Sequence, residues 1–150
     1  MKKVEVISEG ANYSAVNVGS IDTLREHKLP MGPGVEVAGK VFVGSALKAT
    51  GAEMSFQTFA PGEGSPFFHA HKTHEELYII IKGNGEFEVD GKTFPITEGS
   101  IVRVATAGMR ALRNTGSTDM VMICIQYKES SFAADDSPMN DGIISDKPMK

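Results

Sequence analysis

The sequence predicts an all-β domain built as a barrel or a sandwich of short strands. From residue 40 onward, short runs rich in β-branched and aromatic residues alternate with Gly, Pro and Asn, a pattern typical of strands joined by turns. The segments Gly83-Asn84-Gly85 and Asp90-Gly91 tolerate the positive φ angles that two-residue hairpin turns require. With 150 residues, of which 41% are hydrophobic, the chain is large enough for one domain with a sizeable core.

The chain divides into three parts. Residues 1–39 form an N-terminal extension that we expect to pack on the barrel. Its segment "IDTLREHKL" predicts one short helix, with Asp22 as N-cap and Pro30 just beyond the end. Residues 40–128 carry the strand pattern and predict the barrel itself. Residues 129–150 are polar and acidic, so we expect this tail to lie along the surface, to reach a neighbouring subunit, or to be partly mobile.

Composition argues for a small-molecule partner. The formal net charge is −4 and the sequence has no Lys/Arg cluster, which argues against binding of nucleic acid or of an anionic membrane. No apolar segment has membrane-spanning length, and we expect a cytoplasmic protein. The single cysteine, Cys124 in "VMICIQY", excludes an internal disulfide and predicts a buried, inert thiol.

The stretch "FFHAHKTHEELYIIIKG", residues 67–83, is the main candidate for a functional site. If 66–71 is a strand, His69 and His71 share one face, and Glu76 in the next strand comes back over them. Two neutral imidazoles and one carboxylate form a site that suits Fe(II), and also Mn, Ni or Zn, with positions left for water and substrate. The alternative is a solvated turn that happens to contain histidines and glutamates.

This stretch resembles the first motif of the cupin family. That motif is a glycine, then H-x-H, three or four residues, a glutamate, six residues and a glycine. His69-Ala70-His71, Glu76 and Gly83 fit this spacing, although the leading glycine is displaced by one position.

The family's second motif has its counterpart in "GSIVRVATAGMRALRN". Gly99 and Asn114 match it, whereas Ala105 and Ala107 replace its proline and glycine. Arg110 stands where the family has a metal-binding histidine. The resemblance therefore extends over both motifs but departs from the family at one metal ligand.

The resemblance covers roughly residues 40–128 and implies a double-stranded β-helix, also called a jelly-roll barrel. It also implies a divalent metal ion, either Fe, Mn, Ni or Zn. Cupins include oxygenases, isomerases, decarboxylases and non-catalytic binding domains, so the fold does not select the chemistry. We expect a metal-binding cupin-like protein that acts on a small anionic molecule, as an oxygenase or isomerase. The alternative is a non-catalytic ligand-binding cupin with a degenerate metal site.

Arg110 decides between three arrangements of this site. At roughly 6 Å and an effective dielectric constant of about 20, a guanidinium and a dication repel each other by about 5 kcal/mol. Arg110 therefore pairs with Glu76 in a metal-free pocket, points aside while the three ligands hold a metal, or joins the metal in clamping an anionic substrate such as a carboxylate.

Several other residues have expected positions around the site. His74 is a further candidate ligand, but it lies in the predicted turn. Tyr78 is a candidate catalytic residue together with Arg110, because a buried phenol needs a hydrogen-bond partner and can donate to a substrate. We expect Glu75 to face solvent and His27 to be exposed on the helix. Strand parity places further residues at the pocket wall: Phe67, Ile80 and Leu112. Gln57 is a further candidate for the pocket, with its direction left open.

We also expect a homodimer. Cupin barrels have open sheet edges that need to be covered, and residues 1–39 offer extra strands for pairing with a partner's sheet.

Overall fold

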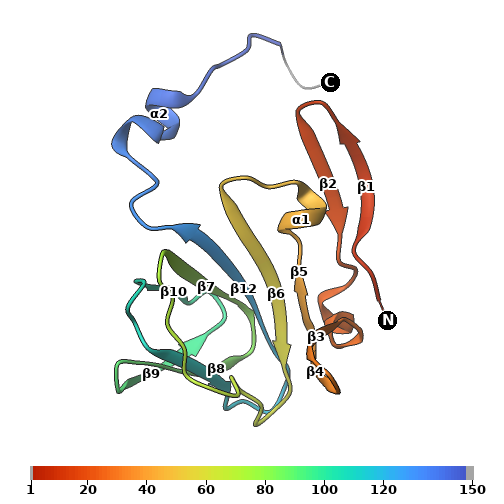
Figure 1. Ribbon diagram of the computed structural model, residues 1–150, viewed down its shortest axis with the longest axis vertical. Coiled ribbons are helices and arrows are strands. Elements are labelled where there is room, and N and C mark those ends of the chain that lie inside the picture. The colour runs from red at the N-terminus through yellow and green to blue at the C-terminus, as the bar shows by residue number, and fades with distance from the viewer. Residues whose placement is uncertain (1, 148–150) are drawn as a thin grey trace.

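The computed structural model describes residues 2–147 and confirms the all-β architecture (Figure 1). The last three residues of the predicted tail lie outside this range. The short helices are η1 (Ile21–Glu26), α1 (Gly44–Leu47), η2 (Ala134–Asp136) and α2 (Pro138–Asp141). In chain order the strands are β1 (Glu5–Gly10), β2 (Tyr13–Asn17), β3 (Lys28–Gly32), β4 (Val35–Ala38), β5 (Lys40–Phe42), β6 (Ala52–Phe59), β7 (His74–Lys82), β8 (Asn84–Val89), β9 (Lys92–Thr97), β10 (Ile101–Val104), β11 (Arg110–Asn114) and β12 (Met120–Lys128).

Two antiparallel sheets form the barrel. One has the strand order β10-β7-β12-β6-β5, and the other has the order β11-β8-β9. One hydrophobic core lies between them, because the same cluster of buried side chains draws on both sheets. This core contains Phe59, Tyr78, Ile80, Met122 and Cys124 from the larger sheet and Phe87, Ile96 and Leu112 from the smaller one. The predicted jelly-roll barrel is thereby confirmed.

The hairpin turn between β8 and β9 forms where the sequence predicts it. Asp90 and Gly91 adopt φ angles of 51° and 78°, which lie in the left-handed region that hairpin turns use. Phe87 pairs with Phe94 across this hairpin, and their rings stack with centroids 5.7 Å apart.

The strand register brings a row of polar side chains to one end of the larger sheet. Glu76 of β7 lies opposite Gln126 of β12, and Gln126 lies opposite Glu53 of β6. Two residues further along the same face of β7, Tyr78 is 2% exposed and belongs to the core. The inner face thus changes from apolar to polar toward the end at which β7 begins, and the candidate site lies there.

The N-terminal part of the chain packs on the outside of the larger sheet. Leu24 of η1 and Val18 form a second apolar cluster with Val43 and Val121. The predicted helix is a 3-10 helix, and the side chain of Ser20 caps it in place of Asp22 by accepting a hydrogen bond from the Asp22 backbone.

The expectation that His27 is exposed is wrong. The His27 side chain lies just after η1, is 2% exposed, and its Nε2 lies 2.8 Å from the carbonyl oxygen of Val18. His27 follows the last residue of η1 and has an extended backbone, so its ring turns inward. The prediction assumed that the helix continues through His27 and therefore gave the wrong direction for this side chain.

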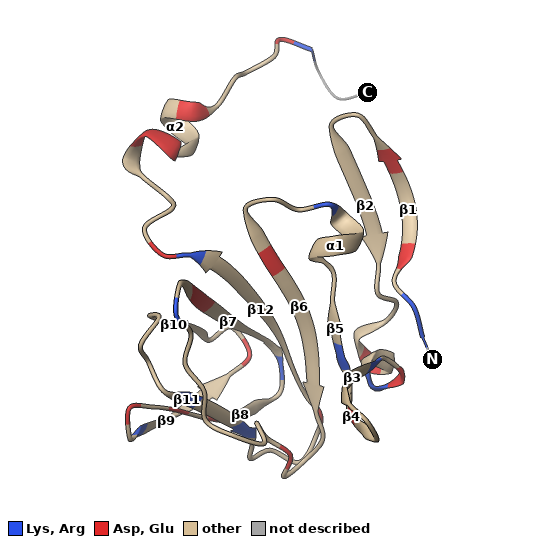
Figure 2. Cartoon of the chain, viewed as in Figure 1, with Lys and Arg blue, Asp and Glu red and all other residues tan. Residues whose placement is uncertain are grey.

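The tail after β12 extends away from the barrel and carries η2 and α2 (Figure 1). Its apolar residues Met139, Ile143 and Ile144 are each more than nine-tenths exposed. Acidic and basic residues are spread along the whole fold (Figure 2). Among residues 2–147, no helix combines the length and the apolar character needed to cross a bilayer.

A candidate metal centre at the barrel mouth

The two histidines of the motif lie in an irregular segment. The strand predicted for 66–71 is not formed. Residues 60–73 run beside β11 and make isolated bridges, one of which pairs His69 with Arg110 through two backbone hydrogen bonds of 3.0 and 3.2 Å. Pro66 lacks an amide donor, which is one physical reason why a regular ladder does not form. Phe67 consequently faces outward and is 55% exposed, so it does not line the pocket as predicted.

The structure nevertheless brings His69, His71 and Glu76 together. One ligand atom from each residue lies within 4.8 Å of the other two. Nε2 of His71 is 3.1 Å from Oε1 of Glu76, and Nε2 of His69 is 3.8 Å from Oε2. Both histidines come from the irregular segment, whereas Glu76 comes from the inner face of β7.

The chemistry of these three residues fits a cation, and a buried nitrogen among them supports this. Nε2 of His71 is buried and has no hydrogen-bond partner within the described part of the chain, although a carboxylate oxygen of Glu76 is close to it. A buried polar atom without a partner is unfavourable by about 1–3 kcal/mol. A divalent ion bound between the imidazole and the carboxylate would satisfy both, and two imidazoles with one carboxylate are suitable donors for Fe, Mn, Ni or Zn.

Arg110 holds the other oxygen of Glu76. Its guanidinium is 0% exposed and pairs through Nη2 and Nε with Oε2 of Glu76, with the Nε contact at 3.1 Å. Nε also lies 3.2 Å from the Tyr78 hydroxyl, and Nη1 donates to the carbonyl oxygens of Gly108 and His69. Of the three arrangements considered above, the structure contains the Arg110–Glu76 pair. The guanidinium does not reach the solvent, so it is not placed to clamp an anion.

Both oxygens of the Glu76 carboxylate accept hydrogen bonds. Oε2 accepts from Arg110 and from the Tyr78 hydroxyl, and Oε1 accepts from Gln126 Nε2 at 2.7 Å. Burial alone would raise the pKa of Glu76. The approach of His69 and the hydrogen bonds from Tyr78, Arg110 and Gln126 outweigh burial, so the pKa of this carboxyl lies far below its usual range. Glu76 is therefore an anion held in a fixed orientation.

The Tyr78 hydroxyl donates its hydrogen bond to Glu76 and is not available to a bound ligand. Burial, together with the negative charge of Glu76, raises the pKa of Tyr78 above its usual range, so the phenol stays protonated. Its one proton is engaged with Glu76. In this arrangement neither Tyr78 nor Arg110 presents a free donor to a ligand, which argues against the catalytic roles predicted for them.

His74 lies at the start of β7 and not in a turn. Its ring stacks on that of His71, with centroids 3.6 Å apart and planes inclined by 34°. It lies outside the three-residue group, and its buried Nε2 has no hydrogen-bond partner among the described residues. The expectation that Glu75 faces solvent is also wrong, because Arg103 of β10 forms an ion pair with it and leaves Glu75 only 9% exposed.

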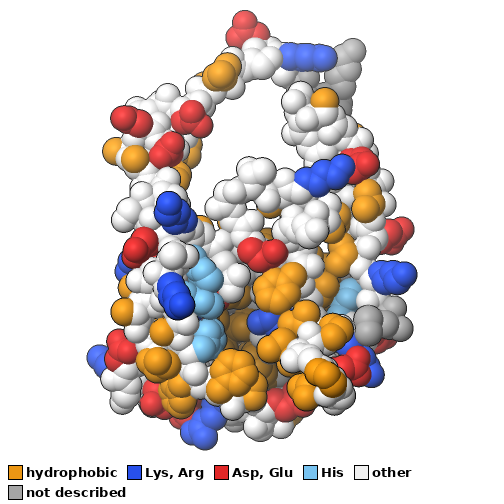
Figure 3. Space-filling view, in the orientation of Figure 1, with side chains coloured by type: hydrophobic (Ala, Val, Ile, Leu, Met, Phe, Trp, Pro, Cys, Tyr) orange, Lys and Arg blue, Asp and Glu red, His pale blue; other side chains and the backbone are white. Residues whose placement is uncertain are grey.

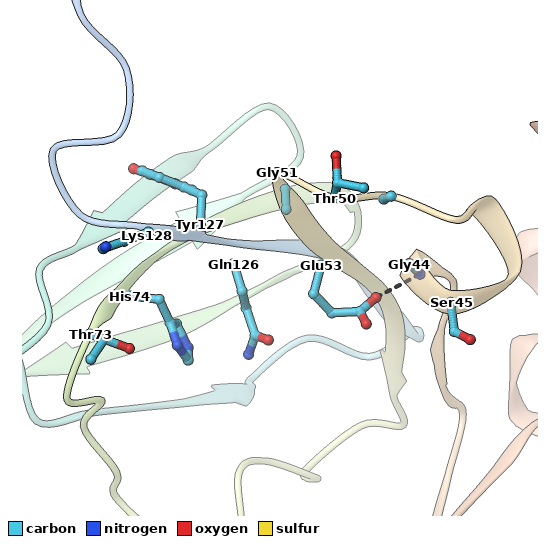
Figure 4. Close-up of a pocket in the computed structure, with 12 residues that line it drawn as sticks. Gly44, Ser45, Thr50, Gly51, Glu53, Thr73, His74, Gln126, Tyr127 and Lys128 are labelled. Carbon is cyan, nitrogen blue, oxygen red and sulfur yellow. Dashed lines mark hydrogen bonds between the residues drawn. The ribbon is translucent and has the colours of Figure 1, made fainter. Parts of the chain in front are cut away.

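An open depression of about 750 Å³ adjoins this centre. Figure 4 shows Glu53, Gln126 and His74 on its wall, with their side chains directed to the same side of the sheet. Glu53 is tied to the backbone of Gly44 by a 2.7 Å hydrogen bond, and Gln126 is bonded to Glu76. Gln126 was not predicted as a site residue. The alternation of Met122, Cys124 and Gln126 in one strand nevertheless places it on the inner face.

Comparison with known proteins identifies what this chain is similar to. A family model described as "Cupin domain" matches residues 55–126. A cupin protein from Bacteroides fragilis is 31% identical, with a TM-score of 0.67 over 78% of this chain and 99% of that chain. A predicted oxalate decarboxylase from Thermotoga maritima is 21% identical, with a TM-score of 0.55 over 68% of this chain and 90% of that chain.

Two curated relatives match over shorter segments. The oxalate-binding protein of Thermotoga maritima is 31% identical over 65 residues, which is 43% of this chain and 54% of that protein. A protein from Methanocaldococcus jannaschii, described as uncharacterized, is 24% identical over 71 residues, which is 47% of this chain and 57% of that protein. The chain thus matches little more than half the length of these relatives.

Proposed function

This chain belongs to the cupin family, and on that premise we propose that it holds a divalent metal ion with His69, His71 and Glu76 and binds a small carboxylate there. The observation that supports the metal is the convergence of His69, His71 and Glu76, whose ligand atoms lie within 4.8 Å of one another, with the buried Nε2 of His71 facing Oε1 of Glu76. The similarity to an oxalate-binding protein supports a carboxylate as the ligand.

The other residues of the site act on Glu76. Arg110 and Tyr78 fix Oε2, so that Oε1 keeps its orientation toward His71. We assign both residues a positioning role. A bound divalent ion would supply a Lewis acid that attracts a carboxylate oxygen and stabilises negative charge on it. Because no hydroxyl or guanidinium of this set is free, the arrangement favours ligand binding over the oxygenase and isomerase activities.

One observation favours an isomerase as a second candidate. The His74 imidazole lies against His71 and has a buried nitrogen that is not engaged by any described residue. When a metal ion holds the carboxylate of a ligand, a neighbouring imidazole is a suitable base for removing the proton from the ligand's α-carbon. Deuterium uptake from D2O into a carboxylate such as malate or lactate, lost in His74→Phe, would support this activity. Absence of uptake across a panel of carboxylates would leave only the binding function.

Calorimetry on the metal-loaded full chain tests the binding function. We expect oxalate to bind the protein loaded with Mn²⁺ and not the protein treated with a chelator. His71→Ala should abolish oxalate binding because a two-ligand remnant holds metal weakly. Oxalate binding of equal strength with and without metal would contradict the proposal.

We further propose a homodimer. Val6 and Ile7 on β1 are more than half exposed, and the tail residues Met139, Ile143 and Ile144 have almost no contact with the rest of the chain. Exposed apolar residues of this kind are typical of surfaces that a partner covers. Light scattering at micromolar concentration should give the mass of two chains, and a monomer mass would refute the proposal.

A further inference from the structure

Lys40 is a cation on the inner face of the larger sheet, and the described residues offer it no acidic partner. It begins β5 and lies opposite Gln57 of β6, whose side chain is buried on the inner face. Lys40 Nζ lies 3.2 Å from Oε1 of Gln57 and 5.2 Å from the centre of the Phe42 ring. Among residues 2–147, no carboxylate lies within 4.0 Å of this ammonium group.

This isolation is unfavourable for a charged group that is partly buried. Burial lowers the pKa of Lys40, and the negative charge of Glu76 opposes this effect only in part. A neutral amide oxygen is the only hydrogen-bond acceptor that the described residues offer to it. By contrast, Arg110 has a carboxylate, a hydroxyl and two carbonyl oxygens around it. The cation that is free to receive an anion is therefore Lys40 and not Arg110.

Lys40 shares the inner face of the larger sheet with Glu76 but lies deeper in the barrel, in the row that contains Gln57, Met122 and Ile80. β5 is the edge strand, and β6 and β12 separate it from β7, which carries Glu76. Three strand spacings of about 4.8 Å and an offset of four residues at about 3.4 Å each set the two backbones roughly 20 Å apart along a flat sheet, less where the sheet curves. Figure 3 shows hydrophobic side chains gathered beside the pale blue histidines on this face of the molecule.

The separation has a consequence for the size of the ligand. The two carboxyl carbons of oxalate are one bond apart, about 1.5 Å. An anion of that length at the metal centre does not also reach an ammonium group held on β5. A dicarboxylate with methylene groups between its two ends is longer, so its second carboxylate can approach the ammonium group.

We propose that Lys40, oriented by Gln57, binds the second carboxylate of an aliphatic dicarboxylate whose first carboxylate lies at the His69, His71 and Glu76 centre. This inference rests on the proposed function and specifies its substrate class. The ligand is then recognised at both ends, by the metal centre and by the ammonium group, and its length is selected by the distance between them.

Calorimetry with a series of acids tests this inference on the full chain loaded with Mn²⁺. The probes are propionate, oxalate, succinate, glutarate and adipate. We expect one of the three longer diacids to bind the natural sequence more tightly than propionate or oxalate. Lys40→Met should weaken the binding of that diacid about tenfold, which corresponds to the loss of one charge-assisted contact. Propionate and Mn²⁺ should bind as before.

Two control variants test whether the effect of Lys40→Met depends on the positive charge at this position. Lys92→Met removes one positive charge from an exposed position on β9 and should leave all affinities unchanged. Lys40→Arg keeps the charge and should retain the preference for the longer diacid. The melting temperature of Lys40→Met should not fall, because the substitution removes a half-buried charge without an acidic partner.

The outcomes distinguish the two proposals. If carboxylates bind in the presence of metal, but Lys40→Met and the natural sequence bind every acid alike, the role of Lys40 is refuted and the proposed function stands. If no acid binds although Mn²⁺ does, the carboxylate part of the proposed function is wrong and the role of Lys40 is refuted with it.

Discussion

Arg110→Met is expected to destabilise the protein strongly, because it leaves the Glu76 carboxylate buried without its cation. Both side chains are almost inaccessible, at 0% and 3% exposed. Removing one partner of a buried ion pair typically lowers the free energy of unfolding by about 3–5 kcal/mol. Methionine retains the apolar stem of arginine, so the loss reports on the guanidinium and its contacts more than on a cavity. For a chain of this size the melting temperature should fall by roughly 6–20 °C.

Urea unfolding followed by circular dichroism measures this loss, with chelator present so that metal binding does not contribute. Arg113→Met is a matched control on the same strand. Arg113 pairs with Glu86 at 2.6 Å, but its side chain is 66% exposed, and such surface pairs contribute only about 0–1 kcal/mol. In the double variant Arg110→Met/Glu76→Gln, part of the lost stability should return, because the unpaired charge is gone. A loss for Arg110→Met within 1 kcal/mol of that for Arg113→Met would refute this reasoning.

Two further predictions concern groups away from the metal centre. Burial raises the pKa of the Cys124 thiol to about 12, so iodoacetamide at pH 8 should label Cys124 only after unfolding; rapid labelling of the native protein would show that this strand opens. His27→Ala should lower the free energy of unfolding by about 1–3 kcal/mol, because it removes the group that contacts the buried carbonyl of Val18. The neighbouring exposed Lys28→Ala serves as its control in urea unfolding, and equal stabilities of the two variants would contradict the role of His27.

Much of the fold and the convergence of the motif residues follow from local sequence patterns. The turn at Asp90-Gly91 and the alternation in β7 and β12 depend only on neighbouring residues, and strand parity places Glu76 and Tyr78 on one inner face. Cys124 is buried, as its apolar strand predicted.

Other features depend on contacts between segments distant in the sequence. The segment with His69 is held by isolated bridges to β11 and not by a regular ladder, so strand parity gave a wrong direction for Phe67. The direction of the Arg110 guanidinium is set by Glu76 and by the carbonyl oxygen of His69, both of which are distant in the sequence. In the sequence Lys40 is an ordinary polar residue at the start of a short strand, and only its pairing with Gln57 shows that it faces inward.

Metal content of the untagged protein, purified without added metal, tests the central claim most directly. We predict close to one equivalent of Fe, Mn, Ni or Zn per chain by inductively coupled plasma mass spectrometry. His71→Ala should lose it, whereas His74→Ala, which alters the ring stacked on His71 but lies outside the three-residue group, should retain it. If the natural sequence holds no metal after incubation with each of these four ions, or if His71→Ala holds as much as the natural sequence, then His69, His71 and Glu76 do not form a metal centre.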